Sequence, residues 1–130
     1  MNIVFLTTGG TIDKVYFDAM SRFEVGETVV GKVLREGGVT FEFEVLPLMR
    51  KDSLELTDDD RATILEAVRT SDCSRILITH GTDTMAQTAQ VLKPLADRTI
   101  VLTGAMQPAR MRRTDAIFNI GFAWAAAQLL

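Results

Sequence analysis

The sequence predicts an α/β fold with three layers, in which a parallel sheet carries helices on both faces. Short runs of apolar, often β-branched residues recur along the chain, and such runs are typical of strands buried on both faces. Segments with helical signals lie between these runs. Because strand and helix alternate in this way, we predict a parallel sheet of the Rossmann or flavodoxin-like kind.

Four segments are predicted as strands. Residues 3–6, 75–79 and 99–103 are nearly continuous apolar runs, so we expect these three strands to be buried on both faces. Residues 41–46 alternate between apolar side chains and glutamate. This alternation predicts a half-exposed strand nearer an edge of the sheet.

Four segments are predicted as helices. Thr57 is a good N-cap, and the three aspartates that follow it suit the first turn of a helix. Residues 83–92 and 115–128 are predicted as two further helices, and a weaker one over about 28–35 ends before Gly37-Gly38. Residues 13–26 show neither the periodicity of a helix nor the alternation of a strand, so we expect a long, mobile loop there.

Composition favours one domain spanning residues 1–130. The chain has 47% hydrophobic residues, 17 acidic and 14 basic side chains, and a net charge of −3. A mildly acidic chain is a poor nucleic-acid binder, and residues 118–130, its longest near-apolar stretch, fall short of the ~20 residues of a membrane-spanning helix. With no signal peptide and a single cysteine, Cys73, we expect a cytoplasmic protein that binds neither nucleic acid nor membrane.

The three apolar strands end in similar loops. Each strand ends in threonine, and glycine follows within three residues, at residues 7–11, 79–84 and 103–106. Turns favour glycine and threonine for their geometry alone, which accounts for the glycines but poorly for the additional hydroxyls and the acid. Because ligands of open α/β sheets bind outside the carboxyl ends of the strands, we expect a site where these loops converge.

The first two loops suggest nucleophilic catalysis. Two glycines before Thr11 allow a tight turn that exposes its hydroxyl beside backbone N–H groups able to hold an oxyanion. The pattern is neither G-x-G-x-x-G nor a Walker loop, which disfavours nucleotide binding. Thr82 and Asp83 bring a proton-passing hydroxyl and a carboxylate, although Asp83 suits a helix N-cap equally well. His80 is expected to orient or pack rather than to act as a general base.

Other polar clusters are assigned simpler roles. The three consecutive aspartates at 58–60 point in different directions around a helix and complement its dipole, so we predict no metal and no other cofactor. Arg110, Arg112 and Arg113 form a basic spot. It would suit an acidic substrate, but pairing with surface or subunit carboxylates is the simpler interpretation.

The last predicted helix is apolar on nearly every side. Residues 118–130 contain a tryptophan, two phenylalanines and several alanines and leucines, with little polar interruption. Such a helix needs cover all round, from the sheet and from a partner or further chain. We therefore expect a homo-oligomer, either a dimer or a tetramer.

Two motifs resemble the signatures of the bacterial-type L-asparaginase family. They are residues 8–12, Thr-Gly-Gly-Thr-Ile, and residues 80–85, His-Gly-Thr-Asp-Thr-Met. Residues 103–108, with Asp115 and Asn119, also resemble the family's next strand and helix. The resemblance covers nearly the whole chain but only the family's larger N-terminal domain. We therefore expect residues 1–130 to be that domain, either complete or shortened at its C-terminus.

The resemblance implies an amidohydrolase that converts L-asparagine into L-aspartate and ammonia. Thr11 resembles the nucleophile that forms an acyl-enzyme, and Thr82 and Asp83 resemble the second threonine and the acid that holds the substrate's α-amino group. The family's catalytic tyrosine aligns with Phe23, so Tyr16, the only tyrosine of the chain, is the candidate replacement. The substrate-binding set implied in this way is Gly10, Asp52, Ser53, Gly81, Thr82 and Asp83.

The chain departs from the family pattern in two places. The family's substrate-gripping Ser-Gln pair falls at Arg50-Lys51. The family's catalytic lysine lies on a strand after the final predicted helix, so Lys14, Lys51 or a partner's lysine would have to serve. A close relative preferring glutamine, and a non-catalytic domain that binds asparagine, aspartate or a related small amide, are therefore the alternatives to an asparaginase.

Overall fold

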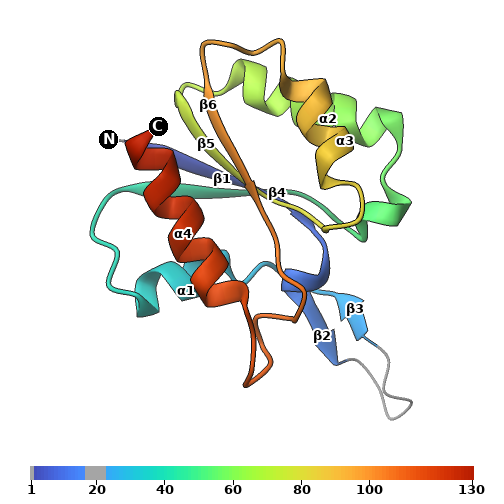
Figure 1. Ribbon diagram of the computed structural model, residues 1–130, viewed down its shortest axis with the longest axis vertical. Helices are drawn as coiled ribbons and strands as arrows, with labels where there is room; N and C mark the ends of the chain where they lie inside the picture. The colour runs from blue at the N-terminus through green and yellow to red at the C-terminus, as the bar shows by residue number, and fades with distance from the viewer. Residues whose placement is uncertain (1, 17–22) are drawn as a thin grey trace.

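The computed structural model describes residues 2–16 and 23–130 (Figure 1). Its centre is a sheet of four parallel strands, in the order β4 (Phe43–Lys51), β1 (Ile3–Gly9), β5 (Arg75–Thr79) and β6 (Thr99–Thr103). Numbered along the chain, these strands follow the order 2-1-3-4, which is that of flavodoxin-like sheets. The predicted parallel α/β fold is therefore confirmed.

Helices cover both faces of this sheet (Figure 1). α1 (Val30–Glu36) and α4 (Ala116–Leu129) lie on one face, and α2 (Asp58–Thr70) and α3 (Met85–Leu92) lie on the other. Two single turns of 3₁₀-helix, η1 (Thr11–Asp13) and η2 (Ser53–Glu55), follow the ends of β1 and β4. All four predicted helices are present, with ends shifted by one to two residues.

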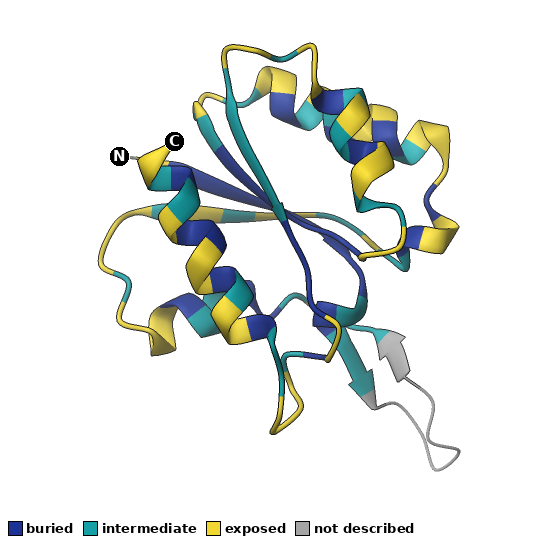
Figure 2. Cartoon of the chain, viewed as in Figure 1, coloured by how far each residue is buried: buried dark blue, intermediate teal, exposed yellow. Residues whose placement is uncertain are grey.

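The central strand β1 divides the hydrophobic core into two halves. Successive side chains of a strand point to opposite faces, so Ile3 and Phe5 pack toward α1 and α4, while Val4 and Leu6 pack toward α2 and α3. Every residue of β1 is buried (Figure 2). The prediction of burial on both faces is therefore confirmed for β1 and for most of β5. It is wrong for β6, which lies at the other edge of the sheet and has four half-buried residues.

The edge strand β4 shows the alternation that its sequence predicts. Its residues are half-buried or exposed along the whole strand, as expected at an edge. The strand continues to Lys51, five residues beyond the predicted end at residue 46, and it includes Pro47. Edge strands tolerate proline because one side of their backbone needs no hydrogen-bond partner.

The helix after Thr57 begins with the predicted cap. Its hydroxyl oxygen accepts a hydrogen bond from the Asp60 N–H at 3.1 Å, and the Asp60 carboxylate accepts one from the Thr57 N–H at 2.9 Å. This reciprocal pair is a capping box. The aspartates of residues 58–60 occupy the first turn, as expected.

The predicted loop at residues 13–26 contains two short strands instead. β2 (Lys14–Tyr16) pairs antiparallel with β3 (Phe23–Val25), and the Gly26 N–H donates to the Asp13 carbonyl at 2.8 Å, closing the base of the hairpin. Strands of three residues are too short for a period of two to show in the sequence. Residues 17–22 and the side chains of residues 16, 23 and 24 lie outside the described part.

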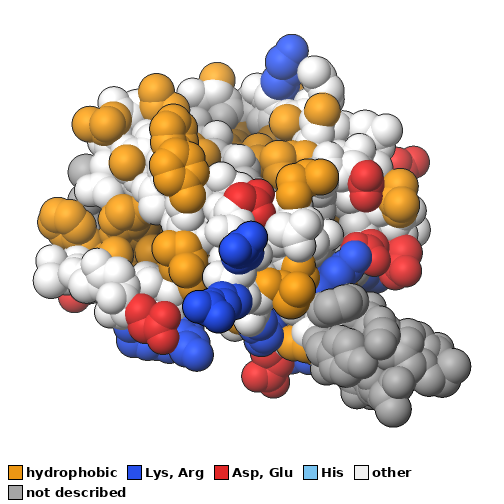
Figure 3. Space-filling view, turned by 60° about the horizontal axis from the view of Figure 1, so that its bottom comes forward, with side chains coloured by type: hydrophobic (Ala, Val, Ile, Leu, Met, Phe, Trp, Pro, Cys, Tyr) orange, Lys and Arg blue, Asp and Glu red, His pale blue; other side chains and the backbone are white. Residues whose placement is uncertain are grey.

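Helix α4 is covered on one side only. Trp124 is buried and stacks on Phe5, with ring centroids 5.8 Å apart, so the tryptophan lies in the core. Phe118 and Phe122 on the opposite side are 73% and 68% exposed, and Figure 3 shows hydrophobic side chains gathered at the surface on the side where Figure 1 draws α4. Within the described residues, none of the helices combines the length and the hydropathy needed to cross a membrane.

Candidate active site

Two glycine turns bring the carboxyl ends of β1 and β5 into contact. Gly10 has a φ of +84°, and a Cβ placed on it would lie 2.5 Å from the backbone nitrogen of Gly81. Only a residue without a side chain permits this approach. The contact lies where the strand order of the sheet reverses, which is the usual ligand site of open α/β sheets.

The same turn is closed against β4. Gly9 has a φ of +104°, and a Cβ placed on it would lie 2.6 Å from the Lys51 nitrogen. The Gly10 N–H also donates to the Lys51 carbonyl at 2.9 Å. The loop before Thr11 is therefore held between the ends of β4 and β5.

Thr11 begins the η1 turn and is half-buried. Ile12 beside it is fully buried and its carbonyl accepts a hydrogen bond from the Ala109 N–H at 3.0 Å. The Asp13 N–H donates to the Gly10 carbonyl at 3.2 Å. The turn is therefore anchored on both sides of Thr11.

Thr82 and Asp83 lie in the exposed part of the β5 loop. The Thr82 hydroxyl approaches the Met106 sulfur at 3.8 Å, so the β5 and β6 loops are also neighbours. The N-cap of α3 is Thr84 and not Asp83, and no side chain caps this helix. The capping interpretation of Asp83 is therefore wrong.

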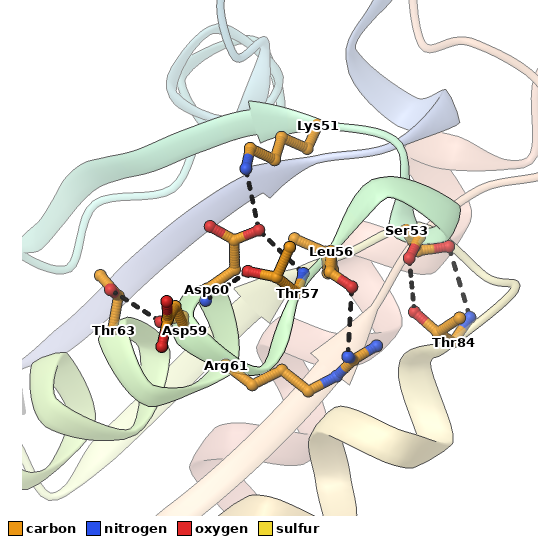
Figure 4. A network of polar contacts seen from close by, with 9 residues as sticks. All are labelled: Lys51, Ser53, Leu56, Thr57, Asp59, Asp60, Arg61, Thr63 and Thr84. Atoms are coloured by element: carbon orange, nitrogen blue, oxygen red, sulfur yellow. Dashed lines mark hydrogen bonds and ion pairs between the residues drawn. The ribbon is translucent and has the colours of Figure 1, made fainter.

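Ser53 lies beneath the β5 loop. It is buried, its hydroxyl accepts a hydrogen bond from the Thr84 N–H at 3.3 Å, and its carbonyl accepts one from the Thr84 hydroxyl at 2.9 Å (Figure 4). A Cβ on Gly81 would lie 2.7 Å from the Ser53 hydroxyl oxygen. The structure thus brings Ser53 to the site, with its polar groups bound to protein.

The cations near the site are paired. The Lys14 ammonium lies 3.2 Å from the Asp52 carboxylate, and Arg50 lies 3.4 Å from the Glu27 carboxylate. Lys51 contacts the Asp60 carboxylate at 2.9 Å, at the start of α2 (Figure 4). Lys14 lies three residues after Thr11 in the sequence. The Lys51 side chain is instead held at the start of α2 by Asp60.

Arg110 binds backbone carbonyls. Its guanidinium donates to the carbonyl oxygens of Asp13 at 3.1 Å and of Glu27 at 2.7 Å. These carbonyls flank the β2–β3 hairpin on both sides. Neither of the two interpretations of the basic spot, substrate or carboxylate pairing, describes this contact, because a sequence does not show which backbone an arginine reaches.

Asp13 is a buried carboxyl that no sequence pattern indicated. It is 1% exposed, and its Oδ1 accepts the Val29 N–H at 3.0 Å. Burial raises its pKa to about 6, against the opposing effects of the hydrogen bonds and of the nearby arginines. Asp13 lines a cavity of about 240 Å³ with Thr7, Thr28, Met49 and Arg50, among others.

His80 is fully buried, as its predicted orienting role requires. Its Nδ1 lies 2.7 Å from the Gly81 carbonyl oxygen and its Nε2 lies 2.7 Å from the Thr88 hydroxyl. Burial lowers the pKa of His80 against the opposing effect of the Gly81 carbonyl, and the charge of Arg61 lowers it further. These effects favour the neutral ring.

Asp115 and Asn119 shape the β6 loop. The Asp115 carboxylate accepts the N–H groups of Met106 at 2.9 Å and Gln107 at 3.0 Å, and these bonds lower its pKa. The Asn119 amide donates to the Gly104 carbonyl at 2.9 Å. Both side chains therefore support the loop from the first turn of α4.

No group of three or more histidine, cysteine, aspartate or glutamate residues suited to a metal is found in residues 2–16 and 23–130.

The structure brings together the loops of Gly10, Thr11, Gly81, Thr82 and Asp83, with Asp52 and Ser53 at the end of β4. The Tyr16 backbone lies in β2, but its side chain is outside the described part. The loops that the sequence predicted to converge are therefore neighbours, whereas the groups that brace them were not predicted.

Comparisons with known proteins agree with this geometry. L-asparaginase 2 of Escherichia coli is 30% identical over 128 residues, covering 92% of this chain and 36% of the relative. A glutaminase-asparaginase of Pseudomonas fluorescens is 26% identical, covering 97% and 38%. The solved L-asparaginase of Thermococcus kodakarensis superimposes with a TM-score of 0.81 at 29% identity, over 98% of this chain and 41% of that one.

The chain thus spans about two fifths of the length of these relatives. The family described as "Asparaginase, N-terminal" matches residues 2–129. This match covers nearly all of the sequence, including the strand-end loops and the helices that brace them. The chain therefore belongs to the asparaginase family, and corresponds to its N-terminal domain.

Proposed function

We propose that the protein is an amidohydrolase that converts L-asparagine into L-aspartate and ammonia, with Thr11 as the nucleophile. The observation that carries the proposal is the contact between Gly10 and Gly81, which sets the Thr11 turn against the loop of Thr82 and Asp83. In this proposal, the two threonine hydroxyls and the carboxylate act on a substrate bound at these neighbouring turns. The names of the relatives, asparaginases and glutaminase-asparaginases, support the same chemistry.

In the proposed reaction the Thr11 hydroxyl attacks the carbon of the side-chain amide. The hydroxyl proton passes to the leaving nitrogen by way of Thr82, and ammonia departs as an ester forms between the substrate acyl group and Thr11. Backbone N–H groups of the glycine turns hold the developing oxyanion. Water then attacks the ester, which releases L-aspartate and restores the hydroxyl.

The remaining candidates are assigned to binding and assistance. Asp83 holds the α-amino group of the substrate, and the backbone at Gly10 and Gly81 contacts the substrate's reacting end. Asp52 contacts the substrate at the end of β4, Ser53 supports the Gly81 turn from beneath, and Tyr16 assists the nucleophile from the β2–β3 hairpin. We further propose a homo-oligomer, because α4 leaves apolar side chains exposed. We also propose a cytoplasmic location, which the single cysteine supports.

Replacing the nucleophile tests the proposal. Thr11→Ala should abolish release of ammonia from L-asparagine, and Thr11→Ser, which keeps a hydroxyl, should retain part of it. Thr40→Ala, an exposed threonine between α1 and β4, is the matched control and should leave the rate unchanged. Wild-type turnover by Thr11→Ala at an unchanged circular dichroism spectrum would show that Thr11 is not the nucleophile.

A binding domain without turnover is the second candidate. It is favoured by Arg50 and Lys51, which stand where the family has its substrate-gripping pair and which are ion-paired to Glu27 and Asp60. Isothermal titration with L-asparagine, L-glutamine and L-aspartate, run beside the ammonia assay, separates the two. Binding of L-asparagine without ammonia release would decide for the binding domain.

A further inference from the structure

A buried chain of polar side chains leads from α2 to the β5 loop. It consists of Arg61, Thr88 and His80, and we call it the His80 chain. The Arg61 Nε donates to the Thr88 hydroxyl oxygen at 3.2 Å, and that hydroxyl lies 2.7 Å from the His80 Nε2. All three side chains are less than 10% exposed, although the catalysis proposed above uses none of them.

The hydrogens of this chain are determined by its two ends. A carbonyl can only accept, so the His80 Nδ1 carries the hydrogen that is donated to Gly81. In the neutral ring Nε2 is then an acceptor, so the Thr88 hydroxyl, whose oxygen accepts from the Arg61 guanidinium, donates its single hydrogen to Nε2. The ring is therefore held in one neutral tautomer, with Nδ1 as the donor.

Arg61 is itself fixed in place. Its other nitrogens donate to the Leu56 carbonyl at 3.4 Å, which Figure 4 shows, and to the Gln87 side chain at 3.2 Å. A protonated His80 would place a second positive charge on the hydroxyl that Arg61 already contacts. The arginine thus favours the neutral ring and keeps the Thr88 hydrogen directed at it.

The His80 ring restrains the peptide that joins Gly81 to Thr82, because it binds the Gly81 carbonyl. Glycine adopts many backbone conformations, so the peptide joining Gly81 to Thr82 could rotate if its carbonyl were free. A trans peptide is planar, with its C=O and N–H on opposite sides. When the carbonyl faces the buried ring, the Thr82 N–H faces the opposite, open side, and it has no protein acceptor among the described residues.

We propose that the His80 chain is a positioning device for the candidate active site, which fixes the peptide after Gly81 and thereby orients Thr82. The proposal rests on the proposed amidohydrolase function. Rotation of this peptide would displace the Thr82 backbone and would also disturb Gly81, against which the Thr11 turn is packed. Groups that act on the transition state lose rate when their orientation is lost.

The test compares two substitutions of Thr88. Thr88→Val removes the hydroxyl at nearly constant shape and should lower kcat roughly tenfold, with KM changed less than about twofold, because orientation and not binding is lost. Thr88→Ser keeps the hydroxyl and should restore kcat to within about threefold of wild type. Thr63→Val, which removes an exposed threonine hydroxyl from α2, is the control and should change neither constant.

A spectroscopic measurement accompanies the kinetics. His80 is the only histidine of the chain, so its two ring nitrogens give unambiguous signals in a long-range ¹H–¹⁵N spectrum. Wild type, Thr88→Ser and Thr63→Val should show the neutral tautomer with hydrogen on Nδ1. Thr88→Val should show a mixture of tautomers and a shifted Thr82 amide signal. An unchanged tautomer and an unchanged kcat in Thr88→Val would overturn the proposal.

A second pair guards against loss of folding. The amide nitrogen of asparagine reaches the position of Nδ1, so His80→Asn keeps a donor for the Gly81 carbonyl, whereas His80→Leu does not. We expect His80→Asn to retain at least about fivefold more activity than His80→Leu; equal activities would count against the proposal. If the wild-type protein releases no ammonia, the proposed function is wrong, and the tautomer and the Thr82 amide signal still decide whether the chain fixes the peptide.

Discussion

Asp13→Asn should stabilise the protein at pH 8 but not at pH 4. The carboxyl is 1% exposed and burial raises its pKa from 3.8 to about 6, so ionisation costs the folded state about 3 kcal/mol that the unfolded chain does not incur. Stability from this group is complete below pH 3.8 and is lost as the pH rises through 6. Asparagine keeps an oxygen for the Val29 N–H and never ionises.

Urea unfolding followed by the fluorescence of Trp124, the only tryptophan, measures the effect. The free energy of unfolding of Asp13→Asn minus that of wild type should increase by about 2.5 kcal/mol between pH 4 and pH 8, because the unfolded carboxyl is already partly ionised at pH 4. Using this difference cancels groups such as Asp115, whose lowered pKa acts in the opposite direction. Asp72→Asn, at an exposed loop position, is the control. A difference that is constant with pH, or that decreases, would refute the reasoning.

Three further predictions concern the turns, the β6 loop and the surface. Gly10→Ala should cost at least about 2 kcal/mol and abolish activity, whereas Gly38→Ala, with a φ of +75° but open space around it, should cost about 1 kcal/mol in the same urea experiment. Asp115→Ala should cost about 1–2 kcal/mol at pH 7, since two backbone N–H groups lose their acceptor; this cost should shrink as the pH falls below 4, because the carboxylate's lowered pKa makes its contribution disappear on protonation. The double substitution Phe118→Glu and Phe122→Glu should reduce the molar mass that light scattering gives at high protein concentration. A wild-type protein with the molar mass of a monomer would contradict the predicted oligomer.

The sheet was predictable because its strands differ in ways that sequence records. β5 and β6 begin and end at the predicted residues, since both are continuous apolar runs bounded by polar residues. The burial of β6 was not predictable, because its apolar run does not show that it lies at an edge of the sheet. The alternation at residues 41–46 identified the edge strand β4, and Thr57 identified the start of α2. Each of these signals is local.

The bracing of the site was not predictable because its contacts are distant in sequence. Arg110 reaches carbonyls of residues 13 and 27, and Arg61 reaches Thr88 through a core that only the folded chain creates. A basic residue on a loop and a charged residue on a helix are otherwise typical of surfaces. Asp13 was missed for the same reason, because nothing around it in sequence indicates that the Val29 N–H, 16 residues later, will bond its carboxyl.

The contact between Gly10 and Gly81 has a consequence for folding kinetics. The contact forms only after β4, β1 and β5 lie side by side, so the candidate site has no precursor that a short segment could form alone. Helix α2, by contrast, has its capping box within four residues. In refolding from urea, helical circular dichroism should therefore recover before ammonia release does, because joining distant segments of the chain is the slower event. Enzymatic turnover then reports completion of the whole sheet and not merely collapse.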